Sequence, residues 1–282
     1  MKGPTPSAKP LPGRQTVREP GYSYVPQHIT AAEAEELAAY FAGLHPQWEQ
    51  RHAKGSTGRR GSRSGLTRPV YWLGAWQFAA LGYYAEPDHL VDKCVRAEPL
   101  PDVMVRILER LRPELGLHGD DALPNTCLIN FYGNTPKGDG RPPVDLARLR
   151  MHRDGEPGPV VMLSVGQPAQ FEFVEPGQPE PFRSQWIRHR SAVVLSGPLY
   201  KDQLYHRVTR VRYGDEPALS AHVDDFEVRR ISVSFRHVPE DRILDLGQLA
   251  PEAQAIARPY VERLAEHSDH FRGQLATATE RE

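Results

Sequence analysis

The sequence has few cysteines, no long apolar stretch and almost no net charge, and each shortage excludes a class of protein. Its 282 residues include only Cys94 and Cys127, which excludes a disulfide-rich scaffold and a zinc site built from cysteines. No apolar run approaches the roughly 18 residues that a membrane span needs, so we expect no membrane partner. The net charge is −1, from 35 Lys+Arg and 36 Asp+Glu, so no overall basic field attracts nucleic acid.

The first residues and the cysteine usage indicate a location. From Met1 to Arg18 the chain carries charges and prolines but no apolar core of a secretory signal. The scarcity of cysteine is typical of a reducing compartment. We therefore expect a cytoplasmic protein, and we expect a monomer.

The chain is rich in turn-forming residues, with 27 Pro and 23 Gly. Between the turns lie short β-branched and aromatic stretches, at residues 128–132, 160–165, 170–174, 192–195, 205–211 and 230–238. This spacing predicts a β-sandwich or jelly-roll core. Helical patterns flank it, because Thr30 to Glu33 form a capping box, Pro101–Leu115 is amphipathic, and the chain turns helical after Pro251. The predicted class is mainly β with flanking helices (α+β).

One constellation of residues indicates metal chemistry. His152 and Asp154 are two positions apart, so in an extended chain both point to the same side. His206 follows 54 positions later on another predicted strand. Two imidazoles and one carboxylate form the facial triad of non-haem Fe(II) oxygenases. Alone, such a pattern arises by chance, and a single histidine is more often a surface or core residue.

A strand near residue 230 carries two arginines on one face and apolar side chains on the other. Arg230 and Arg236 have no acidic residue in their own strand, and buried arginines are costly without an anion. A dicarboxylate would neutralise them, since a guanidinium matches a carboxylate bidentately. Asn130 and Tyr132 share one face of their strand and could donate hydrogen bonds to the same ligand. Alternatively, the arginines are solvated charges on an edge strand.

Taken in order, these residues resemble those of AlkB-like dioxygenases. The matching pieces are Asn130-Phe131-Tyr132, His152-Arg153-Asp154-Gly155-Glu156, Met162 to Gly166, Phe171-Glu172-Phe173, His206 and Arg230 to Arg236. The resemblance covers residues 122–238 well and 70–100 loosely. It implies a double-stranded β-helix (jelly-roll) core that uses Fe(II), 2-oxoglutarate and O2.

The resemblance also implies roles for single residues. The metal ligands and catalytic residues would be His152, Asp154 and His206. Arg230 would bind the distal carboxylate of 2-oxoglutarate, Arg236 would lie near its metal-bound end, and Asn130 and Tyr132 would donate hydrogen bonds to it.

For the substrate, the resemblance implies an N-terminal recognition lid. Trp76 and Tyr83 stand where an aromatic side chain stacks on a flipped-out base, and Glu156 stands where an acidic residue faces that base. The alternative for Trp72 and Trp76 is ordinary core packing.

The implied activity is oxidative dealkylation of N-alkylated bases in single-stranded DNA or RNA, of the alkylation-repair type. It would release succinate, CO2 and formaldehyde. The basic segment 51–68 would contact phosphates, unless it is simply a solvated loop. Two alternatives stay open: a hydroxylase or demethylase of a protein side chain or small molecule, and a β-helix binding module without turnover.

The expected organisation has four parts, namely a flexible tail (1–24), N-terminal helices with the lid (25–120), the dioxygenase core (121–240) and a helical extension (241–282). Three features depart from the family pattern. Tyr132 and His152 are 20 positions apart, which indicates an inserted loop, Ser191-Ala192 replaces the usual Gly-Asp, and the extension has no counterpart in the minimal fold.

Overall fold

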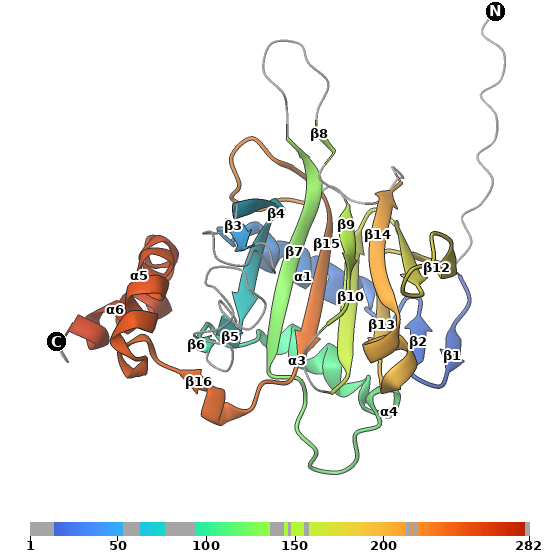
Figure 1. Cartoon of the computed structure of the whole chain (residues 1–282), viewed down its shortest axis with the longest axis horizontal. Coiled ribbons are helices and arrows are strands. Elements are labelled where there is room, and N and C mark those ends of the chain that lie inside the picture. The colour runs from blue at the N-terminus through green and yellow to red at the C-terminus, as the bar shows by residue number, and fades with distance from the viewer. Residues whose placement is uncertain are drawn as a thin grey trace, which may run out of the picture.

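The structure is a computed structural model that describes residues 14–52, 63–76, 94–135, 144–145, 148–154, 158–212, 216 and 219–279. Within these residues, antiparallel sheets form the centre of the molecule and helices lie outside them (Figure 1). The predicted class, mainly β with flanking helices around a jelly-roll core, is confirmed. No helix in this part of the chain is long and apolar enough to cross a membrane.

The larger sheet has nine strands among the described residues, in the order β1-β2-β13-β10-β15-β7-β4-β3, with β8 paired to β7. Its strands are β1 (Val17–Glu19), β2 (Tyr22–Val25), β3 (Gln47–His52), β4 (Arg63–Leu73), β7 (Thr126–Thr135), β8 (Val144–Asp145), β10 (Val160–Gly166), β13 (Ser191–Leu195) and β15 (Glu227–Arg236). At its centre β15 pairs with both β10 and β7, so its residues are covered on both edges.

A second sheet lies against one face of the first. It has the order β12-β11-β14-β9, and its strands are β9 (Leu149–His152), β11 (Ala169–Val174), β12 (Pro181–Ile187) and β14 (Tyr205–Val211). Met162 and Val193 of the large sheet share a hydrophobic cluster with Phe171 and Phe173 of the small one. A third, small sheet contains β5 (Ala75–Trp76), β6 (Cys94–Arg96) and β16 (Ile243–Leu244).

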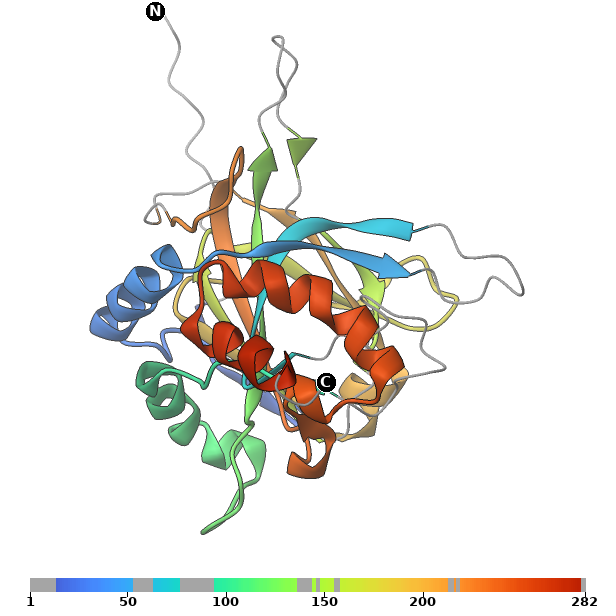
Figure 2. The same cartoon turned by 90° about the vertical axis from the view of Figure 1, so that its left-hand side faces the viewer.

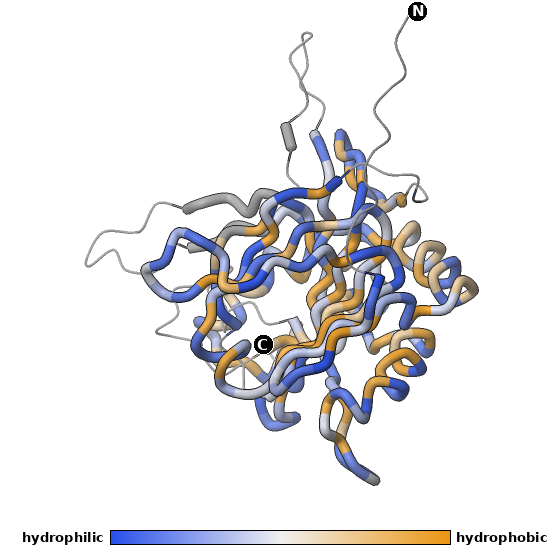
Figure 3. The backbone as a smooth tube through the Cα atoms, turned by 90° about the vertical axis from the view of Figure 1, so that its right-hand side faces the viewer, coloured by the Kyte–Doolittle hydropathy of each residue, from blue (hydrophilic) through white to orange (hydrophobic). Residues whose placement is uncertain are grey.

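Helices cover the opposite face of the large sheet. They are α1 (Ala31–Ala42), α3 (Asp102–Glu109) and α4 (Arg112–Leu115). Ile231, Val233 and Phe235 of β15 pack in the same cluster as these helices, so the alternate residues of β15 point toward the second sheet. Hydrophobic residues gather along the central strands, whereas the helices beside them carry residues of both kinds (Figure 3).

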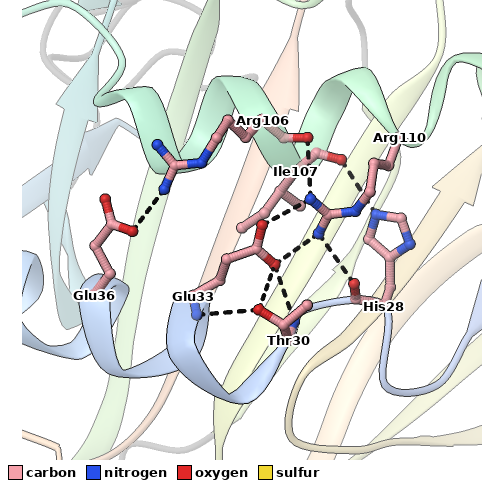
Figure 4. A network of polar contacts seen from close by, with 7 residues as sticks. All are labelled: His28, Thr30, Glu33, Glu36, Arg106, Ile107 and Arg110. Atoms are coloured by element: carbon pink, nitrogen blue, oxygen red, sulfur yellow. Dashed lines mark hydrogen bonds and ion pairs between the residues drawn. The ribbon is translucent and has the colours of Figure 1, made fainter.

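The start of α1 is tied to the end of α3 by a polar network (Figure 4). Thr30 and Glu33 form the predicted capping box, in which each side chain accepts a hydrogen bond from the other residue's backbone N–H. Arg110 donates to both carboxylate oxygens of Glu33, over 2.7 and 2.6 Å. These hydrogen bonds lower the pKa of Glu33 to about 2.

Replacing Glu33 by glutamine should lower the free energy of unfolding by about 1–3 kcal/mol at pH 7, because a charge-assisted bidentate pair is lost. The folded-state pKa of Glu33 is depressed. Its contribution is therefore complete above the unfolded-state pKa of about 4.3 and disappears as the pH falls toward 2. Urea unfolding at pH 7 and pH 3 measures both effects. Glu36→Gln is the control, since the Glu36–Arg106 pair is half-exposed and should contribute less than about 1 kcal/mol. Equal urea midpoints for Glu33→Gln and wild type at pH 7 would show that the Glu33–Arg110 pair does not stabilise the fold.

Two predictions about segments outside the core were wrong in their described parts. In the expected tail (1–24), residues 17–24 contain β1 and all but the last residue of β2, because Tyr22 and Tyr24 bury their rings in the inter-sheet cluster. Residues 63–68, expected in a basic loop, belong to β4, which joins the large sheet through β7. Strands from the expected N-terminal region and the expected core therefore share one sheet.

The C-terminal extension is helical, as the sequence predicts. After the short turns η2 (Glu240–Arg242) and η3 (Leu246–Gln248), it forms α5 (Pro251–Ala265) and α6 (Asp269–Thr279). Figure 2 shows these helices in front of the sheets. They share a hydrophobic cluster with Trp72, Trp76 and Leu128, so they cover these two tryptophan side chains.

Candidate active site

Three side chains with metal-ligating atoms meet between the two sheets. His152 ends β9 and lies directly opposite His206 of β14 in the strand pairing, which places their ring centroids 4.2 Å apart. Asp154 follows two residues after His152, and its Oδ2 lies 3.6 Å from Nε2 of His206. One ligand atom from each of the three lies within 4.8 Å of the others. The strand register thus brings together the histidine and carboxylate pattern found in the sequence.

The electrostatics keep Asp154 and His206 in the forms that bind a cation. Burial alone would raise the pKa of Asp154, but the positive charge of Arg236, which donates to Oδ1 over 2.7 Å, lowers it well below its usual range. Burial lowers the pKa of His206 to about 3, and neighbouring His152 adds to this. At neutral pH the site therefore presents a carboxylate and a neutral imidazole. This donor set suits a divalent transition metal with several coordination positions left open.

A buried lysine supports the turn that carries Asp154. Lys201 lies in the π-helical turn η1 (Leu199–Gln203), is 5% exposed, and donates from Nζ to the backbone oxygen of Asp154 over 3.1 Å. Arg153 points outward instead, where it stacks on Tyr205 and donates to the backbone of Asp202. The His152–Asp154 turn is therefore anchored to the segment that leads into β14.

Replacing Lys201 by methionine should weaken divalent metal binding by about 10- to 100-fold, the usual cost of losing an outer partner of a metal site. The methionine fills a similar volume but leaves the Asp154 carbonyl without its donor. Titration of the metal-free protein with Co(II), followed by absorbance, measures the affinity. Leu199→Ala, on the exposed side of the same turn, is the control. Wild-type affinity in Lys201→Met would exclude an anchoring role.

A cluster of polar side chains continues along the inner face of the large sheet. Arg230 lies opposite Tyr132 in the pairing of β15 with β7, and Asn130 lies two positions away on the same face. Arg230 is 2% exposed; its Nε donates to Ser164 over 3.2 Å, and its carbon Cζ stands 5.0 Å from the Tyr132 ring centroid. Its Nη1 is buried without a hydrogen-bond partner. This orphaned donor, in a guanidinium whose pKa is lowered by burial, fits a carboxylate ligand.

Two members of this cluster were not predicted from the sequence. Ser164 of β10 orients Arg230. Arg68 of β4 is 4% exposed and donates from Nε to Oδ1 of Asn130 over 3.0 Å. The sequence pattern did not single out Arg68, since Val70, Tyr71, Trp72 and Leu73 are all buried and β4 shows no alternation of polar and apolar residues.

The structure does not support a substrate-binding role for Trp76. Trp76 is 1% exposed and packs in the cluster covered by the C-terminal helices, with its ring 5.8 Å from that of Tyr260. A ring so enclosed offers no face to a base, so its expected lid role is replaced by the core-packing alternative. Tyr83 and Glu156 lie outside the described residues.

A second group of histidines forms a different arrangement. His45 stacks on His222 and on His267, with centroids 4.2 and 3.6 Å apart and planes within 8°. In parallel rings the nitrogen lone pairs do not converge on one point. Among the described residues, only the group of His152, Asp154 and His206 brings three candidate ligand atoms together.

A comparison with family models agrees with this site. Residues 21–236 match the family described as the 2OG-Fe(II) oxygenase superfamily. The solved structure of OsALKBH1 is 16% identical, covers 78% of this chain and 100% of its own, and has a TM-score of 0.49. An oxidoreductase of the 2OG-Fe(II) oxygenase family from Burkholderia pseudomallei is 16% identical, covers 79% and 90%, and has a TM-score of 0.43. No curated protein matches the chain. Because the family match spans most of the sequence, the chain belongs to the 2OG-Fe(II) oxygenase superfamily and is a dioxygenase that uses Fe(II), 2-oxoglutarate and O2.

Proposed function

We propose that this dioxygenase removes alkyl groups from nitrogen atoms of nucleobases in single-stranded DNA or RNA. In this proposal His152, Asp154 and His206 hold Fe(II). Arg230 binds the distal carboxylate of 2-oxoglutarate, Asn130 and Tyr132 donate hydrogen bonds to it, and Arg236 lies near its metal-bound end. The observation that carries the oxidative chemistry is the His152–Asp154–His206 triad, together with the buried guanidinium of Arg230, which has an unpartnered donor.

The chain's own residues would act by placement and by exclusion of water. When bound, Fe(II) supplies the activation of O2 that is coupled to the oxidative decarboxylation of 2-oxoglutarate. Arg236 holds one oxygen of Asp154, which leaves Oδ2 on the side of His206. Phe171 and Phe173 of β11 pack against His206 and close that side to solvent. Arg230 fixes the far end of the co-substrate and thereby orients the end that reacts.

A nucleobase substrate is supported by the ordered AlkB-like pieces of the sequence. These include His152 to Glu156 and the strand from Arg230 to Arg236. Hydroxylation of an N-methyl carbon gives an N-hydroxymethyl group, which collapses to the free amine and formaldehyde. Each methyl group removed consumes one O2 and one 2-oxoglutarate, and the other products are succinate and CO2.

One observation favours a second candidate, a protein side chain or small molecule as substrate. Trp76, one of the two aromatic residues expected to stack on a base, is buried in the cluster that contains α5 and α6. A substrate pocket would then not use the Trp76 ring for stacking.

The test supplies Fe(II), ascorbate, 2-oxoglutarate and a short single-stranded oligonucleotide that carries one 1-methyladenine. Mass spectrometry follows the methyl group, and His152→Ala is the control. Demethylation by wild type alone supports the nucleobase proposal. Succinate formation without demethylation, tested also with 3-methylcytosine, favours the second candidate. If neither the demethylated base nor succinate forms although metal binds, the alternative of a binding module without turnover is favoured.

A further inference from the structure

Arg68 occupies an unusual place for a basic side chain. It lies in β4, two residues before Val70, which is opposite Asn130 in the pairing of β4 with β7. Its side chain turns into the protein, where its Cζ stands 5.2 Å from the Tyr132 ring centroid and its Nε donates to Asn130. Arg68 and Arg230 therefore both lie beside the ring of Tyr132.

The two arginines form a buried positive site. Their side-chain partners are Asn130 and Ser164, and among the described residues no carboxylate is ion-paired with either of them. Burial lowers the pKa of Arg230, and the charge of Arg68 lowers it further. Two like charges removed from water at short range are costly unless an anion joins them. The site is thus arranged for a ligand with a localised negative charge.

Arg68 also determines which way the amide of Asn130 faces. A guanidinium only donates hydrogen bonds, so the atom of Asn130 that it contacts must be the carbonyl oxygen. The amide nitrogen then points away from Arg68, so the side of Asn130 that faces away from Arg68 carries hydrogen-bond donors. Without Arg68 the amide could turn over and present an oxygen to an anion, which would repel it.

We propose that Arg68 is a positioning residue for 2-oxoglutarate: it fixes Asn130 as a hydrogen-bond donor and, with Arg230, makes the pocket selective for a dicarboxylate 2-oxo acid. The inference rests on the proposed placement of 2-oxoglutarate beside Asn130 and Arg230. It adds a residue from β4, a strand outside the part of the sequence that carries the resemblance well.

The decisive comparison uses Arg68→Met, Arg68→Gln, Asn130→Ala and the double variant Arg68→Met/Asn130→Ala. The dissociation constant of 2-oxoglutarate is measured calorimetrically with Mn(II) in place of Fe(II), so that no turnover occurs. We expect about a 10- to 100-fold loss of affinity for Arg68→Met. Arg68→Gln, which keeps a neutral donor for Asn130, should lie between Arg68→Met and wild type. The double variant should bind only slightly worse than Asn130→Ala, because Arg68 acts largely through that amide.

Selectivity and kinetics provide independent measurements. Wild type should prefer 2-oxoglutarate to 2-oxobutyrate, which lacks the second carboxylate, and Arg68→Met should reduce this preference about tenfold or more. In succinate formation, KM for 2-oxoglutarate should rise while kcat changes little. Arg106→Met, at an exposed ion pair, is the control.

The outcomes distinguish a positioning role of Arg68 in 2-oxoglutarate binding from a purely structural role. If Arg68→Met lowers the melting temperature but leaves affinity and selectivity unchanged while Arg230→Met abolishes binding, Arg68 is only structural and the inference is overturned. Full additivity in the double variant, or equal affinities for Arg68→Gln and Arg68→Met, would overturn the route through Asn130. If Arg230→Met also binds normally, the proposed co-substrate pocket itself is misplaced.

Discussion

Asp154→Ala should lose 2-oxoglutarate turnover by about a thousandfold or more, well beyond the 10- to 100-fold cost of losing an outer partner of a metal site. Asp154 is the single carboxylate of the triad, so its negative charge would be the main compensation for a bound divalent ion. Its depressed pKa keeps it ionised throughout the range from pH 5 to 8. Succinate formation and bound metal after dialysis should therefore fall together.

The same substitution leaves Arg236 buried without its partner at 2.7 Å. Breaking a buried ion pair on one side costs about 3–5 kcal/mol, so the metal-free variant should also unfold at lower urea. Asp154→Asn separates the two effects, because its amide oxygen can still accept from Arg236 while its negative charge is gone. We expect Asp154→Asn to recover much of the stability but little of the metal affinity. Asp120→Ala removes an exposed carboxylate and serves as control. Wild-type turnover in either Asp154 variant would remove the triad from the mechanism.

The parts of the fold that the sequence predicts are those where a local pattern and its burial coincide. In β15, apolar Ile231, Val233 and Phe235 alternate with Arg230 and Arg236, and the sheet buries both faces. The helix after Thr30 is predicted equally well, since its capping box is contained within four residues.

The parts that the sequence does not predict depend on partners far along the chain. Arg68 stands among glycines, serines and other basic residues and before Pro69, a composition typical of a loop. It becomes part of the inner face only because β4 pairs with β7, some 60 residues later. The sequence around Trp76 predicts a lid residue, but in the structure the C-terminal helices, more than 170 residues away, cover it. Lys201 belongs to a π-helical turn, which no simple periodicity indicates.

Arg230→Met should raise KM for 2-oxoglutarate by roughly 30-fold to several thousandfold. Removing one partner of a buried, hydrogen-bonded charge pair costs about 2–5 kcal/mol, because the other charge is left unpaired. Arg230→Lys should fall in between, since an ammonium keeps the charge but not the two parallel donors. Steady-state succinate formation at varied 2-oxoglutarate measures this series.

Although Arg230→Met should weaken 2-oxoglutarate binding, it should not lower the stability of the ligand-free protein. This combination distinguishes a binding residue from a structural one. Without a ligand, Arg230 is a buried cation with one donor unpartnered, so its hydrogen bond to Ser164 and its contact with the Tyr132 ring offset only part of its desolvation. Arg230→Met should therefore unfold at the same temperature as wild type or higher when ligand is absent. Wild type should gain about 2.7 kcal/mol at a 2-oxoglutarate concentration 100 times its dissociation constant, and the variant should gain almost nothing at that concentration. Arg229→Met, the next residue in the strand, which pairs with Glu227, controls for a general effect on β15. A variant that melts earlier than wild type yet still gains stability from 2-oxoglutarate would make Arg230 a structural residue and place the co-substrate elsewhere.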